Sequence, residues 1–134
     1  MRHLIFACLI SLPTLVAADH DFSPIGAAEF DSYVTGKTLT YAQNGEKYGS
    51  EEYMSGNRVR WSFHDGNCHE GIWFPKGENI CFLYEGEENA QCWVFSMAED
   101  GLVARVVNFP PASSLYETSK SNAPLYCKGP EVGV

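Results

Sequence analysis

The sequence is short of positive charge and of long apolar runs. Its 134 residues include 9 lysines and arginines against 17 aspartates and glutamates, for a net charge of −8. Phosphate binding needs the opposite sign, so nucleic acid is a poor partner. The one long apolar run, residues 4–12, is about half the ~20 residues that cross a bilayer. We therefore expect no transmembrane span.

The sequence also lacks the short motifs of common catalytic and metal chemistry. It has no Gly-x-Ser-x-Gly elbow, no His-Glu-x-x-His helix and no phosphate-binding glycine loop. The absence of a Cys-x-x-Cys pair disfavours a structural zinc site. The adjacent acids Glu51 and Glu52 would point to opposite faces of a strand, which makes them a poor acid–base pair. We expect neither enzyme activity nor a cofactor.

What the amino-terminal end does have is the layout of a secretory signal peptide over residues 1–18. Arg2 precedes the apolar run, and small residues end the segment at Ala18. This layout predicts a periplasmic or secreted acidic protein. The remaining length suits one core, so we expect residues 19–134 to form a single disulfide-bonded β domain.

The expected domain contains an even number of cysteines. They are Cys68, Cys81, Cys92 and Cys127. In an exported chain this number predicts two disulfides, because oxidising compartments let them persist. No thiol nucleophile would then remain.

From residue 37 onward, short aromatic and β-branched runs alternate with turn signals, which is typical of successive hairpins. The turn signals are Asn44-Gly45, Gly56-Asn57, Gly66-Asn67, Gly86-Glu87 and Asp100-Gly101. They predict strands at residues 37–43, 46–55, 58–65, 68–74, 79–85, 88–99 and 102–109. A short helix or turn at 113–120 and an extended piece at 125–127 would follow.

One helix is predicted before the strands, at residues 25–34. Ser23 would cap it, Pro24 would take its first position and Gly36 would end it. A meander leaves exposed edges unless it closes. We therefore predict a mainly β fold, an antiparallel meander that closes into a small lipocalin-like barrel with a short N-terminal helix.

Turn positions also predict which residues face each other. A hairpin centred on Gly86-Glu87 places Cys81 opposite Cys92, so we expect these two to be bonded and Cys68 to pair with Cys127. A turn between Lys76 and Gly77 places Ile72 opposite Cys81. Extended across the sheet, the registers give one row of Trp61, Ile72, Cys81 and Cys92, and another of Tyr53, Arg60, Trp73, Ile80 and Trp93. Both faces are apolar, so the second must be covered by barrel closure, the helix, a ligand or a partner.

Aromatic side chains on the inner face would either line a pocket or fill the core. They are Tyr53, Trp73, Phe82, Tyr84, Trp93 and Phe95, with Arg60 among them. A barrel interior of this kind suits an apolar or sugar-like ligand. Inward aromatics are more often packing residues, which favours a filled core in so small a barrel. As candidate ligand-binding residues we single out Arg60, Trp73, Phe82 and Trp93.

A metal site is the alternative. His64 and His69 flank the Gly66-Asn67 turn, where they would be cross-strand neighbours able to share copper or zinc. The same residue types are typical of any solvated turn. Cleavage after Ala17 would also place His20 third from a free amine, an arrangement that binds copper or nickel.

Part of the chain, residues 36–96, resembles a group of small exported proteobacterial proteins classed as domains of unknown function. The matching motifs are Gly71-Ile72-Trp73, Ile80-Cys81-Phe82, Cys92-Trp93, Leu39-Thr40-Tyr41 and Tyr48-Gly49. The resemblance implies export and a β fold, and it names no substrate.

Together these features favour a non-enzymatic exported binding module. Its partner would be a small apolar ligand or an envelope protein, and an envelope inhibitor is one such role. The alternative is a periplasmic copper- or zinc-binding protein that uses His64 and His69.

Overall fold

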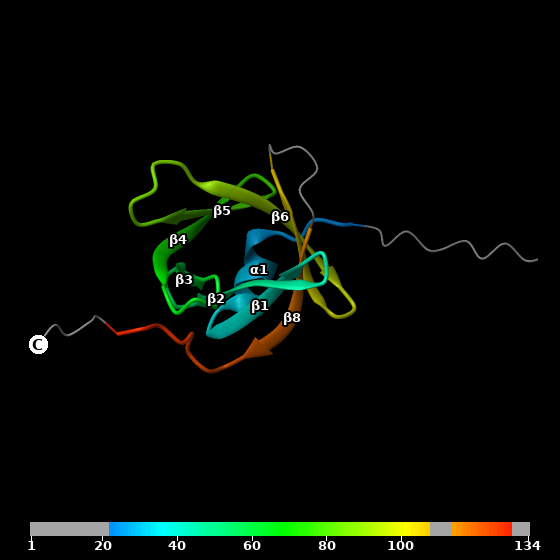
Figure 1. Cartoon of the computed structure of the whole chain (residues 1–134). Helices are drawn as coiled ribbons and strands as arrows, with labels where there is room; N and C mark the ends of the chain where they lie inside the picture. Colours follow the sequence, from blue (N-terminus) through cyan, green and yellow to red (C-terminus); the bar gives the residue numbers. More distant parts are fainter. Residues whose placement is uncertain (1–21, 108–113, 130–134) are drawn as a thin grey trace, which may run out of the picture.

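The computed structural model describes residues 22–107 and 114–129. These form a closed barrel of eight antiparallel strands, and one helix precedes the first strand in the sequence. Each strand pairs with the next, and β8 pairs back to β1. Seen along the barrel in Figure 1, α1 lies inside the ring of strands. The elements are α1 Ala27–Val34, β1 Lys37–Gln43, β2 Glu46–Tyr53, β3 Arg58–Ser62, β4 His69–Lys76, β5 Asn79–Tyr84, β6 Gln91–Ala98, β7 Gly101–Val106 and β8 Leu115–Ser121.

This architecture confirms the predicted barrel with its short N-terminal helix. Within the described ranges, no helix is long and apolar enough to cross a bilayer. The predicted signal peptide at 1–18 and the copper hypothesis at His20 lie outside the described residues.

The helix begins later than predicted. Its N-cap is Gly26, so Ser23 and Pro24 do not start it. Instead, Pro24 forms a β-bridge with Ser96 of β6, and the Ile25 N–H donates to the Phe95 carbonyl over 2.9 Å. Pairing with a strand edge satisfies backbone groups that a helical turn would otherwise use, so Pro24 and Ile25 lie outside the helix.

The prediction of a helix or turn at 113–120 is wrong, because β8 occupies Leu115–Ser121. Leu115 and Glu117 are buried, and Tyr116 between them is half exposed, which is the alternation of a strand with one inner face. The open edges of β1 and β7 supply partners that no local sequence pattern reveals. The expected extended piece at 125–127 carries no strand.

The turn between β2 and β3 is wider than the two-residue turn predicted there. Gly56 and Asn57 adopt left-handed backbone angles, as expected, but Tyr53 pairs with Val59 and not with Arg60. Because side chains alternate along a strand, this one-residue slip reverses the face of β3. Val59 is fully buried and Arg60 lies on the outer face.

The connection between β3 and β4 slips as well. Trp61 pairs with His69 and not with Ile72, because the loop is shaped by two contacts outside a simple turn. Its Asp65 carboxylate accepts the Asn67 N–H at 2.9 Å, and its Gly66 carbonyl accepts an N–H from the C-terminal tail. The second odd shift cancels the first for β4 and beyond. Only β3 is reversed, so the row that placed Trp61 beside Ile72 is wrong.

The remaining registers preserve the predicted faces. Lys76 pairs with Asn79, so Phe74 and not Ile72 lies opposite Cys81. This shift of two residues keeps every side chain on its expected side. Cys81 pairs with Cys92 across β5 and β6 and is bonded to it, and Cys68 is bonded to Cys127, so both predicted disulfides are confirmed.

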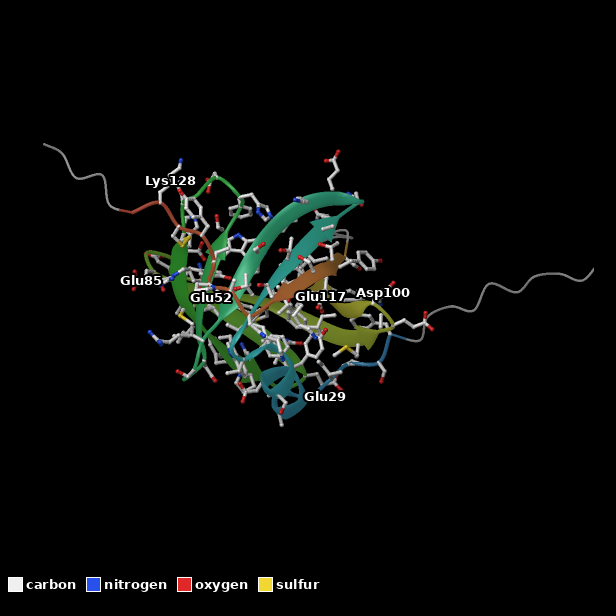
Figure 2. All side chains as sticks on the ribbon, turned by 90° about the horizontal axis from the view of Figure 1, so that it is seen from below. Glu29, Glu52, Glu85, Asp100, Glu117 and Lys128 are labelled. Carbon is white, nitrogen blue, oxygen red and sulfur yellow. A yellow bond between two sulfur atoms is a disulfide. The ribbon has the colours of Figure 1, made fainter. Side chains whose placement is uncertain are left out.

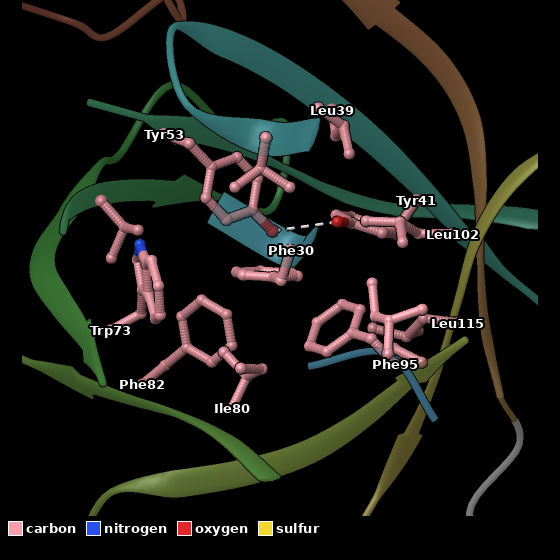
Figure 3. Close-up of a cluster of buried hydrophobic side chains, with 14 residues drawn as sticks. Phe30, Leu39, Tyr41, Tyr53, Trp73, Ile80, Phe82, Phe95, Leu102 and Leu115 are labelled. Atoms are coloured by element: carbon pink, nitrogen blue, oxygen red, sulfur yellow. Dashed lines mark hydrogen bonds between the residues drawn. The ribbon is translucent and has the colours of Figure 1, made fainter. Parts of the chain in front are cut away.

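The core lies where α1 enters the barrel. Phe30 is fully buried and stands at the centre of the cluster in Figure 3. Its ring centre is 5.2 Å from that of Trp73, 5.7 Å from that of Tyr53 and 4.6 Å from that of Phe95. The helix therefore acts as an apolar plug.

The C-terminal tail crosses the outside of the barrel over β1 and β2. The Thr38 hydroxyl donates to the Ala123 carbonyl at 2.7 Å, and the Leu125 N–H donates to Glu52 at 3.0 Å. Figure 2 shows the tail passing Glu52 and ending near Lys128. There the Cys68–Cys127 disulfide ties it to the β3–β4 loop.

Candidate functional site

The two ends of the barrel are built differently. The helix and the turns after β2, β4 and β6 gather at one end, which we call the plugged end. The opposite end, the open end, carries the β1–β2 turn, the long β3–β4 loop and the β5–β6 loop. Because an antiparallel meander alternates its turns between ends, the strands' order along the chain dictates this division.

A cavity of about 140 Å³ lies inside the barrel toward the open end. Its lining is mainly aromatic, formed by Tyr41, Tyr48, Tyr53, Trp61, Phe63, Phe82, Tyr84, Trp93 and Phe95. Ala104 and Leu115 complete the apolar wall, and His69, Glu87 and Gln91 lie toward the loops of the open end. Phe63 is 52% exposed, so the cavity is reached past this ring.

One carboxyl group, that of Glu51, is buried in the cavity wall. Its side chain is 1% exposed and lies on the same face of β2 as Tyr53. The Tyr84 hydroxyl donates to it, at 3.1 Å from each carboxyl oxygen. Burial raises the pKa of Glu51 well above its usual range, and the hydrogen bond from Tyr84 offsets only part of that increase. Burial therefore favours the protonated form of Glu51 over the ionised form.

Besides the Tyr84 hydroxyl that contacts this carboxyl group, two further buried tyrosines line the same cavity. The Tyr41 and Tyr53 hydroxyls are hydrogen-bonded to each other at 2.9 Å, the dashed line in Figure 3. Burial raises the pKa of Tyr41, Tyr53 and Tyr84. All three phenols stay neutral, so they can offer hydrogen bonds but no charge.

The outer part of the cavity depends on a glycine. A side chain at Gly49 would place its Cβ 2.2 Å from Cζ2 of Trp61, so only glycine lets the Trp61 indole lie across β2. The Trp61 ring then meets Tyr48 at 5.7 Å and Phe63 at 5.4 Å between ring centres. These three rings form one wall of the entrance.

The structure separates the four predicted ligand-binding residues. Phe82 and Trp93 line the cavity. Trp73 is buried in the core against Phe30. Arg60, which was expected in the same row as Trp73, forms ion pairs with Glu52 and Glu70 on the outer face. The correction for Arg60 follows from the reversed face of β3.

The histidines of the metal alternative are not cross-strand partners. His69 lies opposite Trp61 and lines the cavity, whereas His64 lies in the loop with a left-handed φ of 66°. In the part of the chain that the structure describes, no group of three or more His, Cys, Asp or Glu side chains could hold a metal ion. The register that motivated this alternative is wrong.

Glu51 was missed as a site residue. The prediction that Glu51 and Glu52 point to opposite faces is confirmed, since Glu52 pairs with Arg60 outside. Strand alternation could have found Glu51, because Gly49, Glu51 and Tyr53 share one face of β2. Alternation alone does not show that this face is buried, because the burial of Glu51 depends on closure of the barrel.

No protein-family model, curated protein or solved structure matches the chain. The resemblance to exported proteobacterial proteins therefore stays a prediction. Any function must be inferred from the chemistry of the cavity.

Proposed function

We propose that this protein is a non-enzymatic binding module, exported to the periplasm or secreted, that takes a small ligand of largely apolar character into the open end of its barrel. The aromatic cavity carries the proposal, because a concave, mainly apolar site with a few inward polar groups is the usual form of a small-molecule site. The two disulfides support export, since such bonds persist in oxidising compartments.

The size of the cavity limits the ligand. A volume of about 140 Å³ is close to the ~150 Å³ of an engineered apolar cavity that binds benzene. Sites for drug-sized molecules start at roughly 300 Å³. The ligand, or the part of it that enters, should therefore be about the size of one ring.

The tryptophans offer a direct test. Trp61 and Trp93 line the cavity, while Trp73 is buried against Phe30 and serves as an internal control. We expect phenol or benzyl alcohol, titrated to about 10 mM, to shift the indole N–H NMR signals of Trp61 and Trp93 saturably and to leave that of Trp73 in place. No saturable shift with any one-ring compound would sink the proposal.

A filled cavity provides the matched variant. Ala104 lines the cavity wall on β7, and Val103 beside it points the other way along the strand. Ala104→Leu should abolish the shifts by occupying the ligand's space, whereas Val103→Leu should leave them unchanged. Equal binding by both variants would place the ligand elsewhere.

A further inference from the structure

Apart from tyrosines, the ionisable side chains that line the cavity are two glutamates and one histidine. Glu51 lies deep inside and Glu87 lies in the loop at the open end. Among the described residues, neither lysine nor arginine lines the cavity, and His69 is the nearest basic type. A ligand with a negative group would meet two carboxyl groups and no fixed positive charge.

From this arrangement we propose that the ligand is a small organic cation, an ammonium or quaternary ammonium group of about one-ring size, with Glu51 as its counter-charge and the indole and phenol rings as its cage. This inference rests on the proposed function, because it assigns a ligand class to the same cavity.

Glu51 has hydrogen-bonding capacity that the described residues do not use. A carboxylate can accept about four hydrogen bonds, and the Tyr84 hydroxyl is shared between its two oxygens. Neither ion pair of the described residues involves Glu51. An uncompensated buried carboxyl group is unfavourable, and a cationic ligand is what would compensate it.

The rings supply the second half of the recognition. The faces of tryptophan and tyrosine attract cations within about 6 Å of the ring centre, and cages of such rings hold quaternary ammonium groups. Trp61, Trp93, Tyr48 and Tyr84 come from four different strands and border one cavity. The net charge of −8 adds a long-range attraction for cations.

Proton release should accompany binding. Burial raises the pKa of Glu51 and so favours its protonated form, whereas an ammonium ion bound beside it would favour the ionised form and release protons to solvent. The other titratable groups around the cavity are Tyr41, Tyr48, Tyr53, Tyr84, His69 and Glu87. Burial raises the pKa of Tyr41, Tyr53 and Tyr84, so these three phenols stay neutral and do not supply this proton.

Choline and 3,3-dimethylbutan-1-ol form a matched probe pair, because they share shape and differ in charge. With the oxidised protein isolated from the periplasm of an expression host, we expect calorimetry at pH 7 to show choline binding at least tenfold more tightly. The dependence of its heat on buffer ionisation should reveal release of part of a proton. Equal affinities would overturn the cation inference and leave the binding function intact, whereas binding of neither probe, nor of any one-ring compound, would remove both.

Two substitutions of neighbouring glutamates isolate the role of Glu51. Glu51→Gln should bring the preference for choline close to one and leave the neutral probe unchanged. Glu52→Gln removes the same charge from the outer face of β2 and should keep the preference. Glu51→Met, an apolar replacement, is a second variant should the amide perturb the site. A preference that survives both Glu51 variants would contradict the inference.

Discussion

The plugged end and the open end of the barrel each bury one glutamate, and the two side chains are held differently. Glu117, next to the helix, accepts the Leu102 N–H at 2.7 Å and the Tyr33 hydroxyl at 2.9 and 3.0 Å. Its carboxylate also occupies the space over Gly101, where a Cβ would lie 2.3 Å from Oε2. Glu51, in the cavity, receives only a shared phenol hydroxyl from the described residues.

This difference indicates a structural role for Glu117 and fits the binding role proposed for Glu51. Glu117 joins α1, β7 and β8, so its hydrogen bonds hold the plug in place. Glu51 joins β2 to β5 through the Tyr84 hydroxyl alone, and a buried carboxyl group with so few partners is unfavourable for stability. Residues that reduce stability are often those kept for binding.

The largest expected difference between the two ends is in their contribution to the free energy of unfolding, to which the plugged end should contribute more. Phe30→Ala removes a fully buried ring and should lower the free energy of unfolding by about 3–5 kcal/mol in urea titrations. Phe63→Ala, at the half-exposed entrance, should lower it by less than about 1 kcal/mol. Similar losses at the two rings would show that the ends are equally important for stability.

The hydrogen bonds of Glu117 give the next largest effect. Glu117→Gln leaves one oxygen acceptor in place of two, so the side chain can no longer accept from both the Leu102 N–H and the Tyr33 hydroxyl on separate oxygens, and we expect a loss of about 1–3 kcal/mol in the free energy of unfolding. Glu99→Gln, an exposed control in the β6–β7 turn, should change it by less than about 0.5 kcal/mol. A neutral result for Glu117→Gln would mean that its carboxylate is dispensable to the plug.

At the open end, even a methyl group added at Gly49 should reduce stability, although a cavity lies nearby. At Gly49 an added Cβ would lie 2.8 Å from the Ser62 carbonyl as well as against Trp61, so Gly49→Ala should cost about 1–3 kcal/mol. Its distinguishing readout is the Trp61 indole N–H signal, which should move while that of Trp73 stays. An unmoved Trp61 signal would contradict the packing described for the entrance.

The smallest expected effect is an increase in the free energy of unfolding, caused by substitution of Glu51. Because the pKa of Glu51 is raised on folding, its contribution to stability is present below its ordinary pKa of ~4.3 and is lost as the pH rises toward the folded value. Glu51→Gln should therefore stabilise the protein by about 1 kcal/mol at pH 7 and by much less at pH 4. Urea unfolding of both proteins at the two pH values measures this difference, and a constant difference would show that Glu51 does not titrate in this range.

Much of the barrel could be predicted because hairpin turns are local. Gly86-Glu87 alone predicts that Cys81 faces Cys92, and a two-residue error at Gly77 leaves Trp73, Ile80 and Trp93 on their correct face. Two of the four predicted ligand-binding residues, Phe82 and Trp93, follow from this alternation and line the cavity.

The sequence by itself determined the order of β1 to β7, the disulfides and the inner faces of β4, β5 and β6, since short turns and period-two alternation carry that information. Tertiary structure alone decided the register between β3 and β4, the strand identity of β8 and the late start of α1. Each depends on a partner distant in sequence: the C-terminal tail at Gly66, the edges of β1 and β7, and the Phe95 carbonyl. Glu51 belongs with these, because a carboxyl group on an alternating strand is buried only once β8 has closed the barrel over it.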